Sequence, residues 1–167
     1  NLAKRWLDDA LRVESEATVS PNHWHHVLVT YDGSRVADGV KIYIDGVSAK
    51  LKVNLDELNQ SFNTSEPFRI GSGGGLETRF RGLIDEVGVY NRVLDTDESQ
   101  IAATADPIDE ILLRHRDQRT AQQALKLRAY FLENHAPDPI RQAQSKLIER
   151  REQKKVFFEN LPTTMVM

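Results

Sequence analysis

Cysteine is absent from this sequence of 167 residues. Disulfide bonds, thiolate nucleophiles and cysteine-ligated metals or haems are therefore excluded within it. The lack of cysteine does not indicate in which cellular compartment the protein works. No apolar run approaches the ~18 residues of a membrane span. The net charge of −3 is too small to indicate nucleic acid or a membrane surface as partner. There is no signal peptide and the first residue is Asn1, so we expect both ends to be cuts through a longer protein.

The two parts of the chain differ in composition on either side of Asp106. Residues 1–105 contain 11 Lys/Arg and 16 Asp/Glu, a net −5, whereas residues 106–167 contain 11 and 9, a net +2. All nine glycines precede Asp106. The sequence therefore predicts a β domain over 1–105 and a helical linker of two to three helices over 106–167.

Residues before Asp106 show the pattern of strands and turns. Apolar and small side chains alternate with charged ones over Leu11–Ala17, which predicts a half-buried strand. His25–Tyr31 is rich in β-branched and aromatic residues and predicts a second strand. Asp45-Gly46, between Val40–Ile44 and Val47–Val53, predicts a two-residue hairpin turn, because a type I′ turn needs positive φ at both positions.

Two further strands are expected before the helices. One is Phe68–Ile70, which runs into the flexible loop Gly71–Gly75, and the other is Leu83–Tyr90, mostly apolar and expected to be buried. No Gly-Lys-Ser/Thr follows the glycines, so a phosphate-binding loop is not indicated.

Start signals for helices follow from residue 95 onward. Asp95–Thr104 is expected to form a short helical turn, and Asp106-Pro107 is expected to open a helix with the acid as N-cap. Thr120 and Gln123 have the spacing of a capping box. Asp138-Pro139 opens a third helix, and we expect a hairpin of two antiparallel helices with a polar outer face.

Four motifs in the first part resemble the laminin-G/concanavalin A-like jelly-roll superfamily. They are Trp24-His-His-Val-Leu-Val-Thr-Tyr-Asp-Gly33, Val40-Lys-Ile-Tyr-Ile-Asp-Gly46, Phe68-Arg-Ile-Gly71 and Phe80-Arg-Gly-Leu-Ile-Asp-Glu-Val-Gly-Val-Tyr-Asn-Arg-Val-Leu94. The resemblance covers about residues 11–104 and implies a mainly β fold, an antiparallel β-sandwich. A jelly roll needs about eight strands, and only six are counted, so the chain is expected to hold the C-terminal half of one.

The second part resembles the linker of large planctomycete multidomain proteins that contain a c-type cytochrome region. The resembling stretches are Arg119–Ala124, Tyr130-Phe131 and Leu161–Met167. This resemblance implies an exported parent protein, periplasmic, secreted or associated with the cell envelope, with neighbouring domains outside this chain.

Several polar groups are candidates for a site. His25 and His26 point to opposite faces of a strand, so packing is favoured over metal binding for them and for His23. Glu14 and Glu16 lie about 6.6 Å apart along a strand, a distance that a glycosidase pair allows, but the expected interpretation is a solvated face.

A ligand site in the glycine loop is the remaining binding hypothesis. Ser72, Glu77 and Arg79 supply polar groups near Phe80 and are the predicted ligand-binding residues.

No catalytic residue, metal ligand or cofactor is predicted. Calcium through Asp32 and Asp85 stays an alternative, although Asp32 is more simply a turn residue and Asp85 more simply bonds backbone.

Three hypotheses for the function of the chain are consistent with the sequence. The first is a non-catalytic recognition or adhesion module, carbohydrate-binding by resemblance, with a glycan or protein ligand. The second is a structural spacer between domains, and the least favoured is a glycoside hydrolase. Because the early strands are expected to be missing, we also expect some of the apolar strand faces at Val27, Val29, Ile42, Ile44, Ile70 and Ile84 to stay uncovered, which would leave the chain marginally stable or self-associating.

Overall fold

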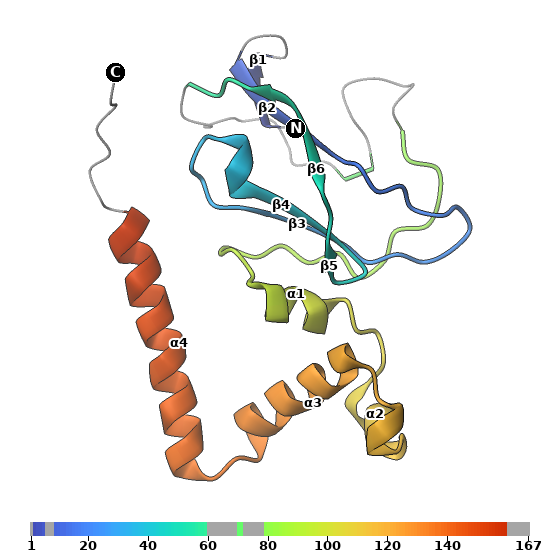
Figure 1. The fold of residues 1–167 in the computed structure, drawn as a ribbon, viewed down its shortest axis with the longest axis vertical. Helices are drawn as coiled ribbons and strands as arrows, with labels where there is room; N and C mark the ends of the chain where they lie inside the picture. The colour runs from blue at the N-terminus through green and yellow to red at the C-terminus, as the bar shows by residue number, and fades with distance from the viewer. Residues whose placement is uncertain (1, 6–8, 60–69, 72–78, 160–167) are drawn as a thin grey trace. The chain divides into compact units, whose positions relative to one another are not determined.

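The computed structural model describes residues 2–5, 9–59, 70–71 and 79–159. The chain divides into two compact units, Asn1–Ala103 and Thr104–Met167. The first contains the strands and one short helix, and the second contains the remaining helices (Figure 1). The predicted boundary after residue 105 lies two residues beyond this division.

The strands are β1 (Leu2–Arg5), β2 (Asp9–Ser15), β3 (Val27–Tyr31), β4 (Val40–Ile44), β5 (Val47–Ser48) and β6 (Leu51–Asp56). The α-helices are α1 (Thr96–Ala102), α2 (Ile108–Leu113), α3 (Ala121–Asn134) and α4 (Asp138–Glu159). Short 3-10 helices cover Ala37–Gly39 and Arg116–Gln118. Within the described residues the α-helices span more of the chain than the strands, so the predicted mainly β class is correct only for the first unit.

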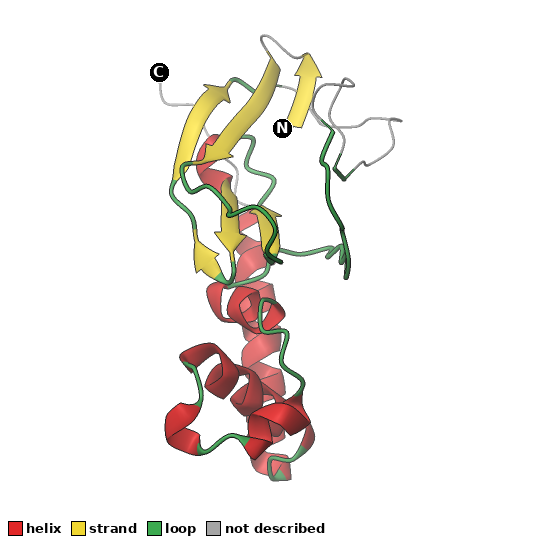
Figure 2. Cartoon of the chain, turned by 90° about the vertical axis from the view of Figure 1, so that its right-hand side faces the viewer, coloured by secondary structure: helices red, strands yellow, loops and turns green. Residues whose placement is uncertain are grey.

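The strands form two antiparallel three-stranded sheets, ordered β1-β2-β6 and β3-β4-β5 (Figure 2). Strand β2 confirms the predicted strand over Leu11–Ser15, although Asp9, Ala10 and Leu11 are all buried and burial does not alternate strictly along it. It pairs with β6 through a register shift between Arg12 and Val13. Strand β1 was not predicted, because its four residues are too few to show a period.

The Asp45-Gly46 hairpin turn is confirmed. Asp45 has φ of 52° and Gly46 has φ of 78°, and Ile44 pairs directly with Val47 across the turn. Strand β3 pairs with β4 in the register that aligns Val27 with Ile44. This hairpin fixes which residues of the preceding loop meet the turn.

The core of the first unit is small and lies where the two sheets approach the first 3-10 helix. Among the described residues, Leu11, Ala37 and Leu58 form its buried cluster, and Val13 and Tyr31 pack against them. Ala10, Val40, Tyr43 and Leu94 are also buried in this unit. The Ala37 amide donates to Asp56 Oδ1 at 2.8 Å, which fixes the 3-10 helix to the end of β6.

The prediction of a buried strand over Leu83–Tyr90 is wrong. The segment is not a strand and its apolar side chains are exposed, among them Leu83 at 77% and Val89 at 79%. Glu86 has φ of 49°, a left-handed conformation that interrupts an extended backbone, and its amide donates to Asp85 Oδ1 instead of to a neighbouring strand. The local apolar pattern predicted that this segment pairs with a neighbouring strand, but among the described residues no strand of either sheet pairs with it.

Apolar faces do remain uncovered in the first unit, as expected. Val27, Val29, Ile70 and Ile84 are each about half exposed, while Ile42 is partly buried. Ile70 lies in a bend, and the rest of the predicted strand Phe68–Ile70 lies outside the described residues.

The helices of the second unit are joined by a polar network around Asp106. Its carboxylate accepts from Gln123 Nε2 at 2.9 Å and from Arg114 Nη2 at 2.8 Å. Lys126 Nζ donates to the carbonyls of Thr104 and Asp106. Asp106 was predicted as the N-cap of α2, but Pro107 occupies that position, since the carboxylate is engaged by α3.

The capping box at Thr120 and Gln123 is confirmed, and a second one links Asp95 and Glu98 at α1. Helices α3 and α4 diverge from their connecting turn (Figure 1), so the predicted antiparallel packing along their length is not found. Arg151 and Lys154 interrupt the apolar stripe of α4, which explains why the stripe does not specify a packed seam. No helix in the described part of the chain is long and apolar enough to span a membrane.

Because the core is small, we expect Leu11→Ala to cost about 2–5 kcal/mol in the free energy of unfolding. Leu11 is only 2% exposed, so its removal leaves a cavity among Ala37 and Leu58. Urea unfolding followed by circular dichroism measures the effect. The matched control is Leu113→Ala at a side chain that is 89% exposed, which should change stability by less than about 0.5 kcal/mol. Equal losses for the two variants would contradict this placement of the core.

Candidate functional site

The most ordered polar cluster of the first unit joins the loop before β3 to the turn after β4. His25 lies two residues before β3, and Asp45 is the first residue of the hairpin turn. Since Val27 pairs with Ile44, continuing that register by one residue on each strand places His26 opposite Asp45, with His25 next to it in the chain. The contact therefore depends on the β3–β4 pairing rather than on any local sequence motif.

Asp45 binds this loop through both carboxylate oxygens. Its Oδ2 lies 2.8 Å from His25 Nδ1, and its Oδ1 accepts from the His26 amide at 2.9 Å. In return, the Asp45 amide donates to the His26 carbonyl at 2.8 Å. On the other side of the ring, His25 Nε2 lies 3.1 Å from Ser20 Oγ and 3.2 Å from the Ser20 carbonyl oxygen. The imidazole thus bridges two segments of the chain, and we call this the His25 clamp.

Charge stabilises the clamp. The hydrogen bond to Asp45 raises the pKa of His25 above its ordinary 6.5, against a smaller opposing effect of desolvation. Desolvation opposes ionisation of Asp45, but the bonds from His25 and His26 outweigh it and lower the pKa of Asp45 below its ordinary 3.8. Both shifts favour the ion pair.

Ser20, His25 and Asp45 have the order of contacts of a serine-hydrolase triad. In such a triad a neutral Nε2 accepts the serine proton. Here Nε2 also faces the Ser20 carbonyl oxygen, which only an Nε2–H group satisfies. With Nδ1 facing a carboxylate, both nitrogens act as donors, and the raised pKa of His25 favours that doubly protonated ring. The geometry therefore favours a clamp over a general base.

Trp24 lies within the clamped loop and is 67% exposed. Beside it, His23 Nδ1 lies 3.0 Å from the Pro21 carbonyl oxygen, and Asn22 turns the backbone with φ of 62°. The indole is thus presented to solvent by a loop whose backbone is fixed by short hydrogen bonds. Packing was favoured for the histidines, whereas the structure leaves the neighbouring Trp24 ring largely uncovered.

The structure does not test the predicted ligand-binding residues. Ser72 and Glu77 lie outside the described residues, so their grouping with Arg79 stays a prediction. Arg79 is exposed, and the neighbouring Phe80 amide donates to the Gly71 carbonyl at 2.7 Å.

Metal binding finds no support in the described part of the chain, where no group of three or more histidine or acidic side chains is arranged to hold an ion. Asp32 Oδ1 accepts from the Ser34 amide at 2.9 Å, within the turn at Gly33. Asp85 likewise accepts from a backbone amide. These contacts agree with the simpler interpretation of both acids.

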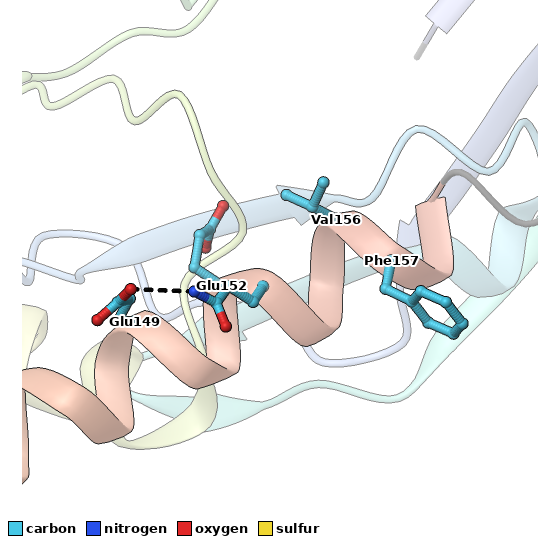
Figure 3. A pocket seen from close by; sticks show the side chains of 5 residues that line it. Glu149, Glu152, Val156 and Phe157 are labelled. Carbon is cyan, nitrogen blue, oxygen red and sulfur yellow. Dashed lines mark hydrogen bonds between the residues drawn. The ribbon is translucent and has the colours of Figure 1, made fainter.

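A surface hollow on α4 was also considered (Figure 3). It is lined by Glu149, Glu152, Gln153, Val156 and Phe157. All five side chains come from neighbouring turns of one helix, and Gln153 bonds Glu149 at 3.0 Å. Such a hollow beside a single helix does not enclose a ligand.

Comparison with known proteins decides the family. Residues 4–100, more than half of the chain, match a laminin-G family model described as the Concanavalin A-like lectin/glucanases superfamily. The chain belongs to this superfamily. No curated protein and no solved structure matches it. The match confirms the resemblance carried by the four motifs and extends it toward the N-terminus, from residue 11 to residue 4.

Because the superfamily includes glucanases, Glu14 in β2 and Glu16 just after it are candidates for a catalytic pair of carboxylates. Glu14 and Glu16 are both exposed, and Glu16 forms an ion pair with Lys50 at 2.9 Å. An exposed acid paired with a lysine is a poor general acid, because it lacks the apolar surroundings that keep a carboxyl protonated. The arrangement agrees with the predicted solvated face.

The His25 clamp predicts a specific pH dependence. A raised pKa for His25 means that its contribution to stability is complete below pH 6.5 and is lost as pH rises through the folded-state value. A lowered pKa for Asp45 means that its contribution is present above pH 3.8 and is lost as pH falls through the folded-state value. The clamp should be strongest between these limits.

An NMR titration of the His25 ring measures this directly. We expect its pKa above 6.5 in the unmodified chain and a return toward 6.5 in Asp45→Asn. The matched control is Asp38→Asn, an exposed acid outside the loop, which should leave the titration unchanged. A His25 pKa at or below 6.5 in the unmodified chain would refute the ion pair.

Proposed function

We propose that the chain is a non-catalytic recognition module that binds carbohydrate, as part of a larger exported protein. The observation that supports this most is membership of the Concanavalin A-like lectin/glucanases superfamily over residues 4–100. Because a fold alone does not fix a function, the assignment also rests on what the surface offers. Trp24, exposed on a fixed loop, is the kind of aromatic group that recognition surfaces present.

The non-catalytic part of the proposal rests on the state of the candidate catalytic groups. Glu16 is paired with Lys50, and both glutamates are exposed. Ser20 lies beside the imidazole of His25, and the contacts of that ring with Asp45 and with the Ser20 carbonyl oxygen favour its charged form. Neither set offers a nucleophile with a free base.

The surroundings of the module are proposed from the resemblance of its second part to exported planctomycete proteins with a cytochrome region. In that setting the helical unit links the recognition module to neighbouring domains, and the parent protein works in the periplasm, at the cell envelope or outside the cell. Helix α4 suits a linker, since it is 22 residues long, about 33 Å, and mostly exposed.

A structural spacer that binds nothing small is the second candidate, and the same exposed α4 favours it. A glycan array probed with the whole 167-residue chain separates the two. We expect binding to at least one glycan above the level of heat-denatured chain. Binding to no glycan, by a chain whose circular dichroism shows that it is folded, would exclude the recognition module and leave the spacer.

We further expect no hydrolysis of polysaccharides or of small esters by the chain. Release of reducing ends from β-glucans and of nitrophenol from p-nitrophenyl acetate are the measurements. Turnover that disappears in Glu14→Gln or Glu16→Gln would establish a glycosidase, and turnover that disappears in Ser20→Ala would establish an esterase. Either result overturns the proposal.

A further inference from the structure

The loop between β2 and β3 is more strongly fixed than its exposure suggests. Ser15, at the end of β2, forms two hydrogen bonds with the backbone of Ala17. At the other end, the His25 ring joins Ser20 to Asp45, and the His26 amide donates to Asp45. The loop is therefore held at its entry, at its exit and across to the β4–β5 turn.

This fixed loop presents a large apolar ring to solvent. Trp24 is 67% exposed although a tryptophan side chain buries about 150–250 Å² when it is covered. Asn22 and His23 directly precede it in the loop, are exposed, and supply amide and imidazole groups. An aromatic face with a polar rim on a rigid backbone needs little ordering when it binds, so most of the contact energy is kept as affinity.

We propose that Trp24 is the stacking platform for one ring of a neutral saccharide, with Asn22 and His23 as its polar rim. A pyranose ring has one face of C–H groups and a border of hydroxyls. The negative face of an indole attracts such C–H groups, and the rim side chains are donors and acceptors for hydroxyls. This inference rests on the proposed carbohydrate-binding function and locates it.

Charge selects neutral saccharides over sulfated or acidic ones. Residues 13–26, which include the whole loop, contain no lysine or arginine, and they contain Glu14 and Glu16. Residues 1–105 have a net charge of −5, from 11 Lys/Arg and 16 Asp/Glu. A polyanion such as heparin would be repelled by the acidic groups here, and this loop has no arginine or lysine side chain to bind its sulfates.

The His25 clamp makes the platform sensitive to pH. Deprotonation of the ring removes the Nε2–H that faces Ser20 and weakens the link to Asp45, which leaves the loop fewer restraints. Groups that face His25 are Ser20 and Asp45, and His26 is the adjacent titratable side chain. Saccharide binding should therefore weaken as pH rises through the pKa of His25.

Isothermal titration calorimetry of the whole chain tests the platform with three neutral probes, cellohexaose, laminarihexaose and xylohexaose, and with a heparin hexasaccharide. We expect at least one neutral probe to bind and heparin not to bind. Trp24→Ala should weaken the neutral probe about tenfold or more, and Trp24→Phe should weaken it less. The matched control is Tyr90→Ala, an aromatic that is 53% exposed outside the loop, which should leave affinity unchanged.

The outcomes separate the inference from the function on which it rests. Binding of a neutral probe that Trp24→Ala leaves intact overturns the platform and keeps the recognition module. Binding of heparin alone overturns the platform and its charge argument. If none of the neutral probes binds, and Trp24→Ala instead reduces the mass of a self-associated chain in light scattering, a second copy covers the ring and the platform is excluded. Since Trp24 is exposed, both variants should fold, which circular dichroism checks.

Discussion

The pairing of β3 with β4 through the Asp45-Gly46 turn is the constraint on which the rest of the first unit depends. Positive φ at both turn residues sets the register, and the register places Asp45 beside the end of the preceding loop. The carboxylate then fixes His25 and the His26 amide, so Trp24 directly precedes two restrained residues. The polar cluster around Asp45 is thus a consequence of the β3–β4 hairpin.

Features fixed by neighbouring residues were predictable from the sequence. The hairpin turn needs Asp-Gly, and the capping box needs Thr120 and Gln123 three positions apart, so each pattern contains its own physical cause. The His25–Asp45 contact was not predicted, since it joins residues 20 positions apart and depends on strand register. The prediction for Leu83–Tyr90 was wrong because a mostly apolar run indicates a preference for burial in a sheet and says nothing of whether a strand edge is available to pair with it.

Several apolar side chains of the first unit are incompletely buried. Its core rests on Leu11, Ala37 and Leu58, while Val27 and Val29 stay more than half exposed on β3. Among the described residues the strands form two three-stranded sheets, whereas a jelly roll has about eight strands. The β2–β3 loop is restrained by hydrogen bonds and an ion pair while Trp24 stays largely exposed, which makes this restraint sensitive to pH.

The account's central claim is that Asp45 holds the Trp24 loop in place. Hydrogen–deuterium exchange of the His26 amide, followed by NMR near pH 5.5, tests this most directly, because that amide donates to Asp45 Oδ1 at 2.9 Å. Asp45→Gly is the informative variant, since glycine keeps the positive φ of the turn and removes only the carboxylate. The account predicts slow exchange in the unmodified chain and fast exchange in the variant. Exchange of His26 at the rate of an unstructured peptide in the unmodified chain would contradict it.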